Sequence, residues 1–166
     1  MTKQFNPRIR TAFGREEIAP LYEIEKECFS PAFRWSKSEF AAQLTKCNVW
    51  IMEDEFPNEP FEDERGVLLM GANHVVGFLV AKIDRGQAYI LTVEVPEKYR
   101  GKGYGASLVN ACERVYKARG FKTIRLEVYT ENPAQLMYFK LGYRVNGFKK
   151  DYYEKGKSAV AMAKTL

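Results

Sequence analysis

Three glycines alternate with larger residues in the segment Arg100-Gly101-Lys102-Gly103-Tyr104-Gly105. A strand-like run ends at Val95 before this segment, and an amphipathic helix begins at about Ala106 after it. Residues without a Cβ let the backbone curl so that several N–H groups point to one place, where the helix N-terminus adds a partial positive charge. The segment therefore predicts a cradle for a pyrophosphate, to which Arg100 and Lys102 add full charges. A plain glycine-rich turn is the alternative.

The glycine spacing differs from the two common phosphate-binding fingerprints. In the dinucleotide-binding pattern G-x-G-x-x-G, the third glycine comes one residue later than Gly105 does here. The P-loop ends in G-K-[ST], and no such ending follows these glycines. Neither of those two sites is therefore indicated.

The order of strand and helix signals predicts an α+β fold. Helices are expected at 18–28, from a capping box at Ser36–Glu39 to about Thr45, from Ala106 to Gly120, and at 133–141. Strands are expected at 8–12, 49–52, 67–70, 75–83, 88–95, 123–129, 143–148 and 158–164. We expect these strands to form a mixed sheet with helices on both faces.

The composition is typical of one soluble globular domain. The chain has 166 residues, of which 46% are hydrophobic and 28% charged, and we expect a single domain over 1–166. No apolar run approaches the roughly 20 residues that span a bilayer, and the first residues lack the pattern of a signal peptide. A cytoplasmic protein without a membrane partner is therefore expected.

Charge is distributed unevenly along the chain. Residues 1–66 hold nine Lys/Arg and thirteen Asp/Glu, a net charge of −4, whereas residues 67–166 hold seventeen and eight, a net charge of +9. The basic half favours a phosphate-bearing partner, either nucleic acid or a nucleotide-type cofactor, and a solvated lysine-rich surface is the alternative.

Seven acids and two prolines, without a base, gather in the segment 53–64. This composition predicts a loop, and we take 53–66 as an acidic insertion in the domain. One hypothesis is that the segment attracts a cationic substrate by long-range electrostatics. The other is that it is a solvated loop that keeps the protein soluble.

Metal-binding residues are scarce. Cys28, Cys47 and Cys112 are an odd number without C-x-x-C spacing, so ordinary buried or half-buried thiols are expected rather than disulfides or a zinc site. The one histidine, His74, follows Gly71-Ala72-Asn73 and is expected in the turn of a hairpin. No metal site is predicted.

The segment Val93–Gly105 resembles the acetyl-CoA motif of the Gcn5-related N-acetyltransferase (GNAT) family, whose core is [Q/R]-x-x-G-x-[G/A]. Arg100, Gly103 and Gly105 occupy its fixed positions. A second block, 126–134 with 138–143, resembles the next conserved segment of the family. Within the family, the sequence looks most like the RimI-type protein N-terminal alanine acetyltransferases, and three further stretches carry that likeness: 28–36, 89–92 and 150–153.

The resemblance implies a GNAT-like, mostly antiparallel sheet and acetyl-CoA as co-substrate. It implies that the pantetheine arm binds backbone groups around the end of the preceding strand, that the diphosphate binds amides of the glycine segment, and that one asparagine contacts the cofactor. The residues concerned are Val93, Glu94, Val95, Arg100, Gly101, Lys102, Gly103, Tyr104, Gly105, Ala106 and Asn132.

The resemblance also implies a general base at Glu127 and a general acid at Tyr138. The alternatives are a solvent-facing strand carboxylate and an aromatic ring that packs under a helix. Asn132 to Tyr138 spans six residues where RimI-type enzymes usually have seven, and one missing residue rotates a helix by about 100°. Either the loop absorbs this difference or the tyrosine is displaced, and the aligned Leu141-Gly142-Tyr143 that follows favours the loop.

Acceptor contacts are implied for Phe33, Trp35, Tyr89 and Tyr152, each of which could equally belong to the core. The function predicted first is acetyl transfer to the N-terminal amine of a protein or peptide, with a ribosomal protein as one candidate, by direct transfer in a ternary complex. The second is transfer to a small-molecule amine such as a polyamine, antibiotic or metabolite. The third is a non-catalytic RNA- or ribosome-binding module, which is disfavoured because the basic half lacks an aromatic-basic pattern.

Overall fold

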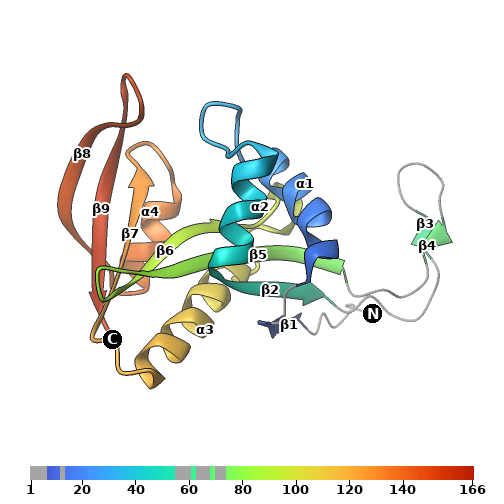
Figure 1. Ribbon diagram of the computed structural model, residues 1–166, viewed down its shortest axis with the longest axis horizontal. Coiled ribbons are helices and arrows are strands. Elements are labelled where there is room, and N and C mark those ends of the chain that lie inside the picture. The colour runs from blue at the N-terminus through green and yellow to red at the C-terminus, as the bar shows by residue number, and fades with distance from the viewer. Residues whose placement is uncertain (1–6, 12–13, 55–60, 63–67, 70–73) are drawn as a thin grey trace.

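Seven strands form one sheet in the order β1-β2-β5-β6-β7-β9-β8 (Figure 1). The computed structural model describes residues 7–11, 14–54, 61–62, 68–69 and 74–166. Neighbouring strands are antiparallel except β6 and β7, which run parallel, so the predicted mixed and mostly antiparallel sheet is confirmed. The strands are β1 Pro7–Arg10, β2 Asn48–Asp54, β5 His74–Asp84, β6 Gln87–Glu94, β7 Thr123–Tyr129, β8 Arg144–Glu154 and β9 Lys157–Thr165.

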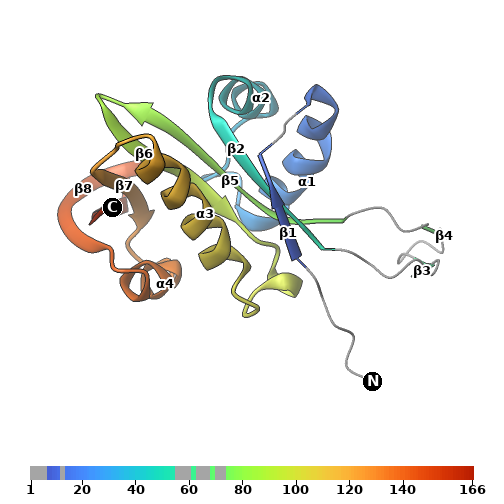
Figure 2. The same cartoon turned by 90° about the horizontal axis from the view of Figure 1, so that it is seen from below.

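Helices cover both faces of this sheet, as the sequence predicted. Helices α1 and α2 lie on one face, and α3 and α4 lie on the other (Figure 2). Their bounds are α1 Ile18–Cys28, α2 Lys37–Lys46, α3 Tyr104–Ala118 and α4 Ala134–Lys140, with short 3-10 turns at Arg15–Glu17 and Glu97–Tyr99. Within the described ranges, no helix is long and apolar enough to cross a membrane.

The sheet separates two apolar cores. Alternate residues of β2 point to opposite faces, so Trp50 packs under α3 while Ile51 packs under α1 and α2. In β5, Leu79 and Phe78 divide in the same way. Because both faces are covered, these central strands consist of nearly continuous apolar residues rather than an alternating pattern.

The acidic segment is not simply a loop. Glu53 and Asp54 belong to β2 and are buried, because Arg10 forms an ion pair with Glu53 and the Tyr104 hydroxyl donates a hydrogen bond to Asp54, 3.0 Å away. Phe61–Glu62 forms a strand, β3, that pairs with β4, Leu68–Leu69. The other residues of the predicted insertion, 55–60 and 63–66, lie outside the described residues, as do both ends, 67 and 70, of the predicted strand 67–70.

Smaller differences concern element bounds. His74 lies in β5 and pairs with Asp54, so the expected turn position was wrong. The last hairpin extends to Glu154 and begins again at Lys157, because a turn at 155–156 replaces the longer loop that was expected. The cysteines are free thiols, with Cys112 buried and the other two half-buried, as predicted.

The parallel pair β6–β7 is joined over two residues only, Ala88 with Ile124 and Tyr89 with Arg125. Beyond these residues the two strands, both fully described, make no further ladder contacts. A bulge at Leu91 shifts the register of β6 against β5 at the same point. Backbone N–H and C=O groups of β6 therefore face a gap in the sheet where a ligand can take the place of a strand.

The cap of α2 yields a stability prediction. The Ser36 side chain accepts a hydrogen bond from the backbone of Glu39, and the Glu39 carboxylate accepts one from the backbone of Ser36, 2.9 Å away. We expect Ser36→Ala to lower the free energy of unfolding by about 1 kcal/mol, because one helix N–H loses its partner. Urea denaturation measures this loss. Ser107→Ala, at an exposed position within α3, is the control and should cause no loss; equal loss in both variants would contradict the cap assignment.

Candidate active site

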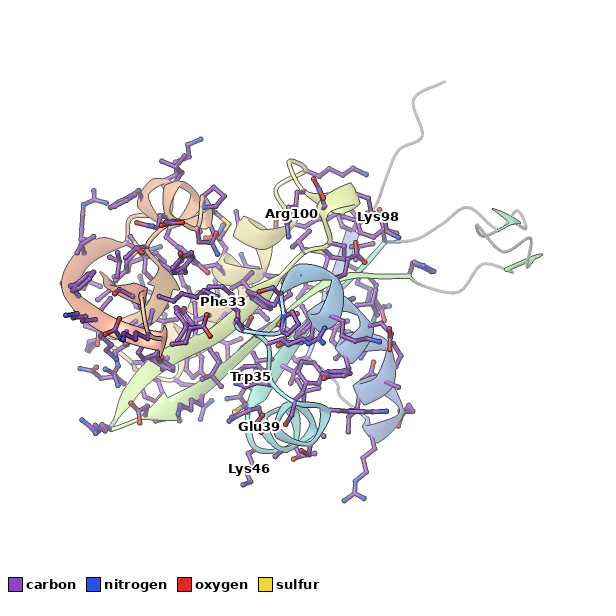
Figure 3. All side chains as sticks on the ribbon, turned by 90° about the horizontal axis from the view of Figure 1, so that it is seen from above. Phe33, Trp35, Glu39, Lys46, Lys98 and Arg100 are labelled. Atoms are coloured by element: carbon purple, nitrogen blue, oxygen red, sulfur yellow. The ribbon has the colours of Figure 1, made fainter. Side chains whose placement is uncertain are left out.

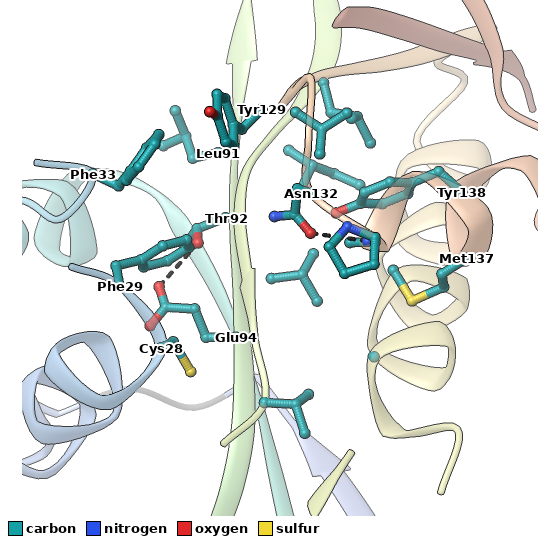
Figure 4. A pocket seen from close by; sticks show the side chains of 18 of the residues that line it. Cys28, Phe29, Phe33, Leu91, Thr92, Glu94, Tyr129, Asn132, Met137 and Tyr138 are labelled. Atoms are coloured by element: carbon teal, nitrogen blue, oxygen red, sulfur yellow. Dashed lines mark hydrogen bonds between the residues drawn. The ribbon is translucent and has the colours of Figure 1, made fainter. Parts of the chain in front are cut away.

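A groove of about 1220 Å³ runs along β6 at the gap in the sheet. One wall comes from the end of α1 and the connection that follows it, and the other from α4 and the end of β7 (Figure 4). Phe33 and Trp35 lie in the first wall, and Arg100 lies in the loop before α3 (Figure 3). Residues that are far apart in the sequence thus meet around one opening.

The glycine segment forms the end of the groove at α3. Gly101 and Gly103 have φ values of +78° and +83°, a left-handed conformation that strains any residue with a Cβ. Gly105 has a different role, because a Cβ there would lie 3.1 Å from the sulfur of Met137 on α4. Two glycines therefore turn the chain, and the third allows α3 and α4 to approach.

The first-turn amides of α3, at Tyr104, Gly105 and Ala106, have no carbonyl one turn earlier in the helix to bond, so they can bind an anion. Of the predicted segment, all residues but Lys102 line the groove. The Lys102 ammonium instead lies 5.8 Å from the ring centre of Tyr99, so that part of the prediction is not supported by its position. Arg100 donates a hydrogen bond to the carbonyl oxygen of Val95, 2.9 Å away.

Val93, Glu94 and Val95, the predicted strand residues, all line the groove, but not all through their side chains. The side chains of Val93 and Val95 pack against the core under α3, so it is their backbone that faces the gap. The Glu94 side chain is 1% exposed and turns toward α1 (Figure 4), where it accepts a hydrogen bond from the Thr92 hydroxyl at 2.9 Å. Glu94 thus has a second, structural role that the motif did not indicate.

Glu94 forms a carboxyl pair with Glu25 of α1. Burial raises the pKa of Glu94 well above its usual range, and the neighbouring Glu25 raises it further. Burial also raises the pKa of Glu25, whose other oxygen accepts a hydrogen bond from the backbone N–H of Trp35 at 2.9 Å. The Glu94–Glu25 pair therefore links β6 to the connection that carries Phe33 and Trp35.

Cys28 also lines the groove. Burial raises the pKa of its thiol, and the charge of Arg100 only partly opposes this effect. A thiol with a raised pKa is mostly protonated at neutral pH and is a poor nucleophile. The groove therefore suits direct attack by a bound substrate better than attack by this cysteine.

Asn132 and Tyr138 reach the groove from the side of α4. The Asn132 oxygen accepts a hydrogen bond from the backbone N–H of Ala134 at 2.9 Å, which turns its amide nitrogen toward β6 (Figure 4). Tyr138 is 6% exposed, and its hydroxyl points into the same space (Figure 4). Tyr138 therefore reaches the groove despite the shorter spacing from Asn132. Burial raises the pKa of Tyr138, so its hydroxyl keeps its proton across the neutral range.

Glu127 lies on β7 with its carboxylate in the groove. Its apolar neighbours, Leu126 and Val128, point to the opposite face, as the sequence predicted, but the side chain is only 3% exposed rather than solvent-facing. The Tyr89 hydroxyl donates a hydrogen bond to one carboxylate oxygen, and the Lys149 ammonium lies 2.6 Å from the other. The structure therefore holds a buried carboxylate, contacted by a hydroxyl and an ammonium group, at the groove wall.

Aromatic rings surround the open end near Glu127. Phe33 packs against Tyr129 and Tyr153, with ring centres 4.9 and 5.1 Å apart, and Tyr152 packs against Tyr153 at 5.0 Å. Rings from the α1–α2 connection, β7 and β8 thus form one wall. Of the predicted acceptor residues, Phe33, Tyr89 and Tyr152 meet here.

Trp35, the fourth predicted acceptor residue, also lines the groove but is not part of this group of rings. Its ring packs toward Phe40 in the core under α1 and α2, and its carbonyl oxygen accepts a hydrogen bond from the Tyr22 hydroxyl. These contacts make Trp35 a support of the wall as well as part of it.

The sequence reasoning missed Glu25, Tyr129 and Lys149. Glu25 looked like one of several helix carboxylates, and only the fold shows that it faces Glu94. The sequence did hold a signal for Lys149, namely the alternating alanines at 159, 161 and 163 of β9. Alternate residues of a strand share one face, so these small side chains leave room above β9. Side chains of the neighbouring strands β7 and β8 can meet in that space.

The groove combines an anion cradle, a buried carboxylate and a protonated tyrosine. These groups suit acyl transfer from a phosphate-bearing donor to an amine, because such a transfer removes one proton from the amine and returns one to the leaving group. Among the described residues, no three His, Cys, Asp or Glu side chains gather as metal ligands would.

Comparison with known proteins points to the same chemistry. The chain is 29% identical over 99 residues to the [ribosomal protein bS18]-alanine N-acetyltransferase of Haemophilus influenzae, which covers 57% of this chain and 68% of that protein. It is 28% identical over 144 residues to an N-alpha-acetyltransferase of Saccharolobus solfataricus, covering 75% and 86% of the two chains.

The fold agrees with a solved structure. The crystal structure of the ribosomal-protein-S18-alanine N-acetyltransferase from Escherichia coli superposes with a TM-score of 0.73 at 20% identity, covering 97% of this chain and 94% of that one. The model of the acetyltransferase (GNAT) family matches residues 18–143, which include α1 through α4 and the whole glycine segment. The chain therefore belongs to the GNAT family of N-acetyltransferases.

Proposed function

We propose that this protein transfers an acetyl group from acetyl-CoA to the N-terminal α-amine of a protein or peptide. The observation that carries the proposal is the buried Glu127 carboxylate at an aromatic-walled opening, with the anion cradle and Tyr138 farther along the same groove. The likeness to relatives named [ribosomal protein bS18]-alanine N-acetyltransferase and N-alpha-acetyltransferase supports the choice of acceptor. A ribosomal protein is one candidate partner.

The groove fits acetyl-CoA. The first-turn amides of α3 and the left-handed glycines suit the diphosphate, and the free backbone edge of β6 suits the two amides of the pantetheine arm. The amide nitrogen of Asn132 can add a further hydrogen bond. Bound acetyl-CoA would supply a thioester, whose carbonyl carbon accepts the amine.

The proposed chemistry uses one residue for each proton. Glu127 takes a proton from the acceptor amine, directly or through a water, as the nitrogen attacks the thioester carbon. The bond between that carbon and sulfur then breaks, and Tyr138 gives its proton to the sulfur. The buried position of Tyr138 keeps the phenol protonated for this step. Holding both substrates along β6 supplies the remaining acceleration through proximity.

An α-amine is an easier acceptor than a lysine side chain. At pH 7, deprotonation costs about 1.4 kcal/mol for an amine of pKa near 8 and about 4.6 kcal/mol for a lysine of pKa near 10.4. The groove volume of about 1220 Å³ also exceeds the roughly 300–1000 Å³ of ordinary small-molecule pockets. Room for a cofactor and a chain end together favours a peptide over a small amine.

The acceptor is tested with acetyl-CoA and one peptide in two forms, and CoA release is measured. Both forms carry an internal lysine, but only one has a free N-terminal alanine. We expect turnover of the free form alone, because the blocked form offers only the lysine. Equal turnover of both forms would contradict the proposal. Turnover of spermidine but of neither peptide would instead indicate a small-molecule amine as the acceptor.

Glu127→Gln tests the general base. We expect kcat/KM for the free peptide to fall about 10²- to 10⁴-fold, because the amide cannot accept the proton. The KM for acetyl-CoA should stay within twofold, roughly, since the cradle is untouched. Glu97→Gln is the matched control, because Glu97 is exposed and its side chain forms no hydrogen bond or ion pair with the described residues. A Glu127→Gln variant as active as this control would exclude Glu127 as the base.

Gly103→Ala tests the cradle, and Gly86→Ala is its control, because alanine would be equally strained at both positions. Gly86, in the β5–β6 turn, also has a left-handed φ, and at neither position would a Cβ meet another atom within 4 Å. We expect both alanine variants to lose roughly 1–2 kcal/mol of stability. Only Gly103→Ala should raise the KM for acetyl-CoA, by about fivefold or more, because the adjacent amides are reoriented. A similar KM in both variants would show that the loop does not bind the cofactor.

A further inference from the structure

The Lys149 ammonium lies in a small site with two kinds of wall. Its nitrogen is 2.6 Å from one carboxylate oxygen of Glu127 and 4.9 Å from the ring centre of Tyr152. A buried carboxylate and an aromatic face are the groups that bind ammonium ions in proteins. Glu127 and Tyr152 line the groove, whereas the Lys149 side chain is 43% exposed. The site therefore belongs to the groove, and the lysine reaches it from outside.

The arrangement of strands explains how the lysine arrives. Glu127 is on β7 and Lys149 on β8, with β9 between them. In β9, Ala161 pairs with Glu127 and Ala159 pairs with Lys149. These small side chains leave space across the middle strand, so the long lysine side chain can cross it to the carboxylate.

The other groups at the site fix the carboxylate but do not occupy the same place. The Tyr89 hydroxyl donates to the second oxygen of Glu127 and lies 3.4 Å from the Tyr152 hydroxyl. The guanidinium of Arg125 stacks on the Tyr89 ring at 5.1 Å and pairs with Asp84, so it does not compete for Glu127. Lys149 is the cation that holds the oxygen facing β8.

We propose that Lys149 occupies the place of the acceptor's ammonium group, beside Glu127 and Tyr152, until the acceptor displaces it. This inference rests on the proposed function and specifies how the substrate first binds. The acceptor arrives as an ammonium ion with the same charge and the same hydrogen-bond donors as the lysine. Once Lys149 has left, Glu127 can take the acceptor's proton.

Lys149→Met tests the proposal by removing the competing cation. Breaking a half-exposed ion pair should lower the KM for the free peptide about two- to fivefold. The KM for acetyl-CoA should not change. Lys149→Arg keeps the cation and the ion pair, so its peptide KM should equal or exceed that of the unchanged protein.

Lys150→Met is the matched control. Lys150 is the next residue of β8, exposed and without an ion pair in the described structure, and its loss changes the net charge equally. The same fall in KM in both methionine variants would mean that long-range charge alone is responsible, and would overturn the proposal. A higher peptide KM in a folded Lys149→Met variant would also overturn it, because Lys149 would then assist binding.

A binding measurement separates this inference from the proposed function. If the unchanged protein turns over no peptide, the proposed function fails, and the site beside Glu127 and Tyr152 is tested with n-propylammonium chloride alone. Amide NMR signals of β7 report binding beside Glu127. Lys149→Met should bind propylammonium at least about twofold more tightly than the unchanged protein, and adding Glu127→Gln should abolish the difference. Equal affinity in the presence and absence of Lys149 would exclude displacement.

Discussion

The separation of β6 from β7 is the constraint on which the rest of the structure depends. A parallel pair that is joined at only two residues leaves backbone hydrogen-bonding groups without a ladder partner in the middle of a sheet. Such an arrangement is stable only if the two halves of the sheet are held together elsewhere. Helix α3 and its core supply that support, because Leu108 and Cys112 belong to one apolar cluster that includes residues of β5 and β7, from the two sides of the gap. The opening for a substrate is thus produced by the sheet, and its width is preserved by the helix beneath it.

Two buried polar contacts, between Glu94 and Glu25 and between Glu25 and Trp35, connect β6 to the groove wall formed by the α1–α2 connection. The carboxyl pair of Glu94 and Glu25 joins β6 to α1, and Glu25 in turn holds the backbone of Trp35. Burial raises the pKa of both carboxyls, which favours their neutral form, and one oxygen of each accepts a hydrogen bond, from the Thr92 hydroxyl or from the Trp35 N–H. The wall that carries Phe33 is therefore positioned by the same strand that lines the cofactor end. We regard this link as the reason why the two ends of the groove keep a fixed relation.

The sequence predicted the parts of the molecule whose signals are local. The strand–glycine–helix junction, the capping box at Ser36 and the apolar periodicity of α3 each depend on neighbouring residues, and each was found where expected. The resemblance to the GNAT family identified Glu127 and Tyr138, which both reach the groove. Contacts that depend on strand order were not predicted: the pairing of Glu25 with Glu94 and of Lys149 with Glu127 joins residues 69 and 22 positions apart. Burial of Glu53 and Asp54 was missed because composition alone cannot distinguish a loop from a strand end whose acids have partners.

The segment that matches the family model ends at residue 143, directly before β8 begins. The β8–β9 hairpin that follows forms one edge of the sheet and contributes Lys149, Tyr152 and Tyr153 to the opening. The glycine segment and the gap between β6 and β7 precede it in the chain. Phe33 and Glu127, which also border this opening, precede the hairpin, so the opening is assembled from stretches that lie far apart in the sequence, whereas the glycine segment is continuous. A change confined to the side chains of β8 would therefore alter one wall of the acceptor opening and leave the proposed donor site as it is.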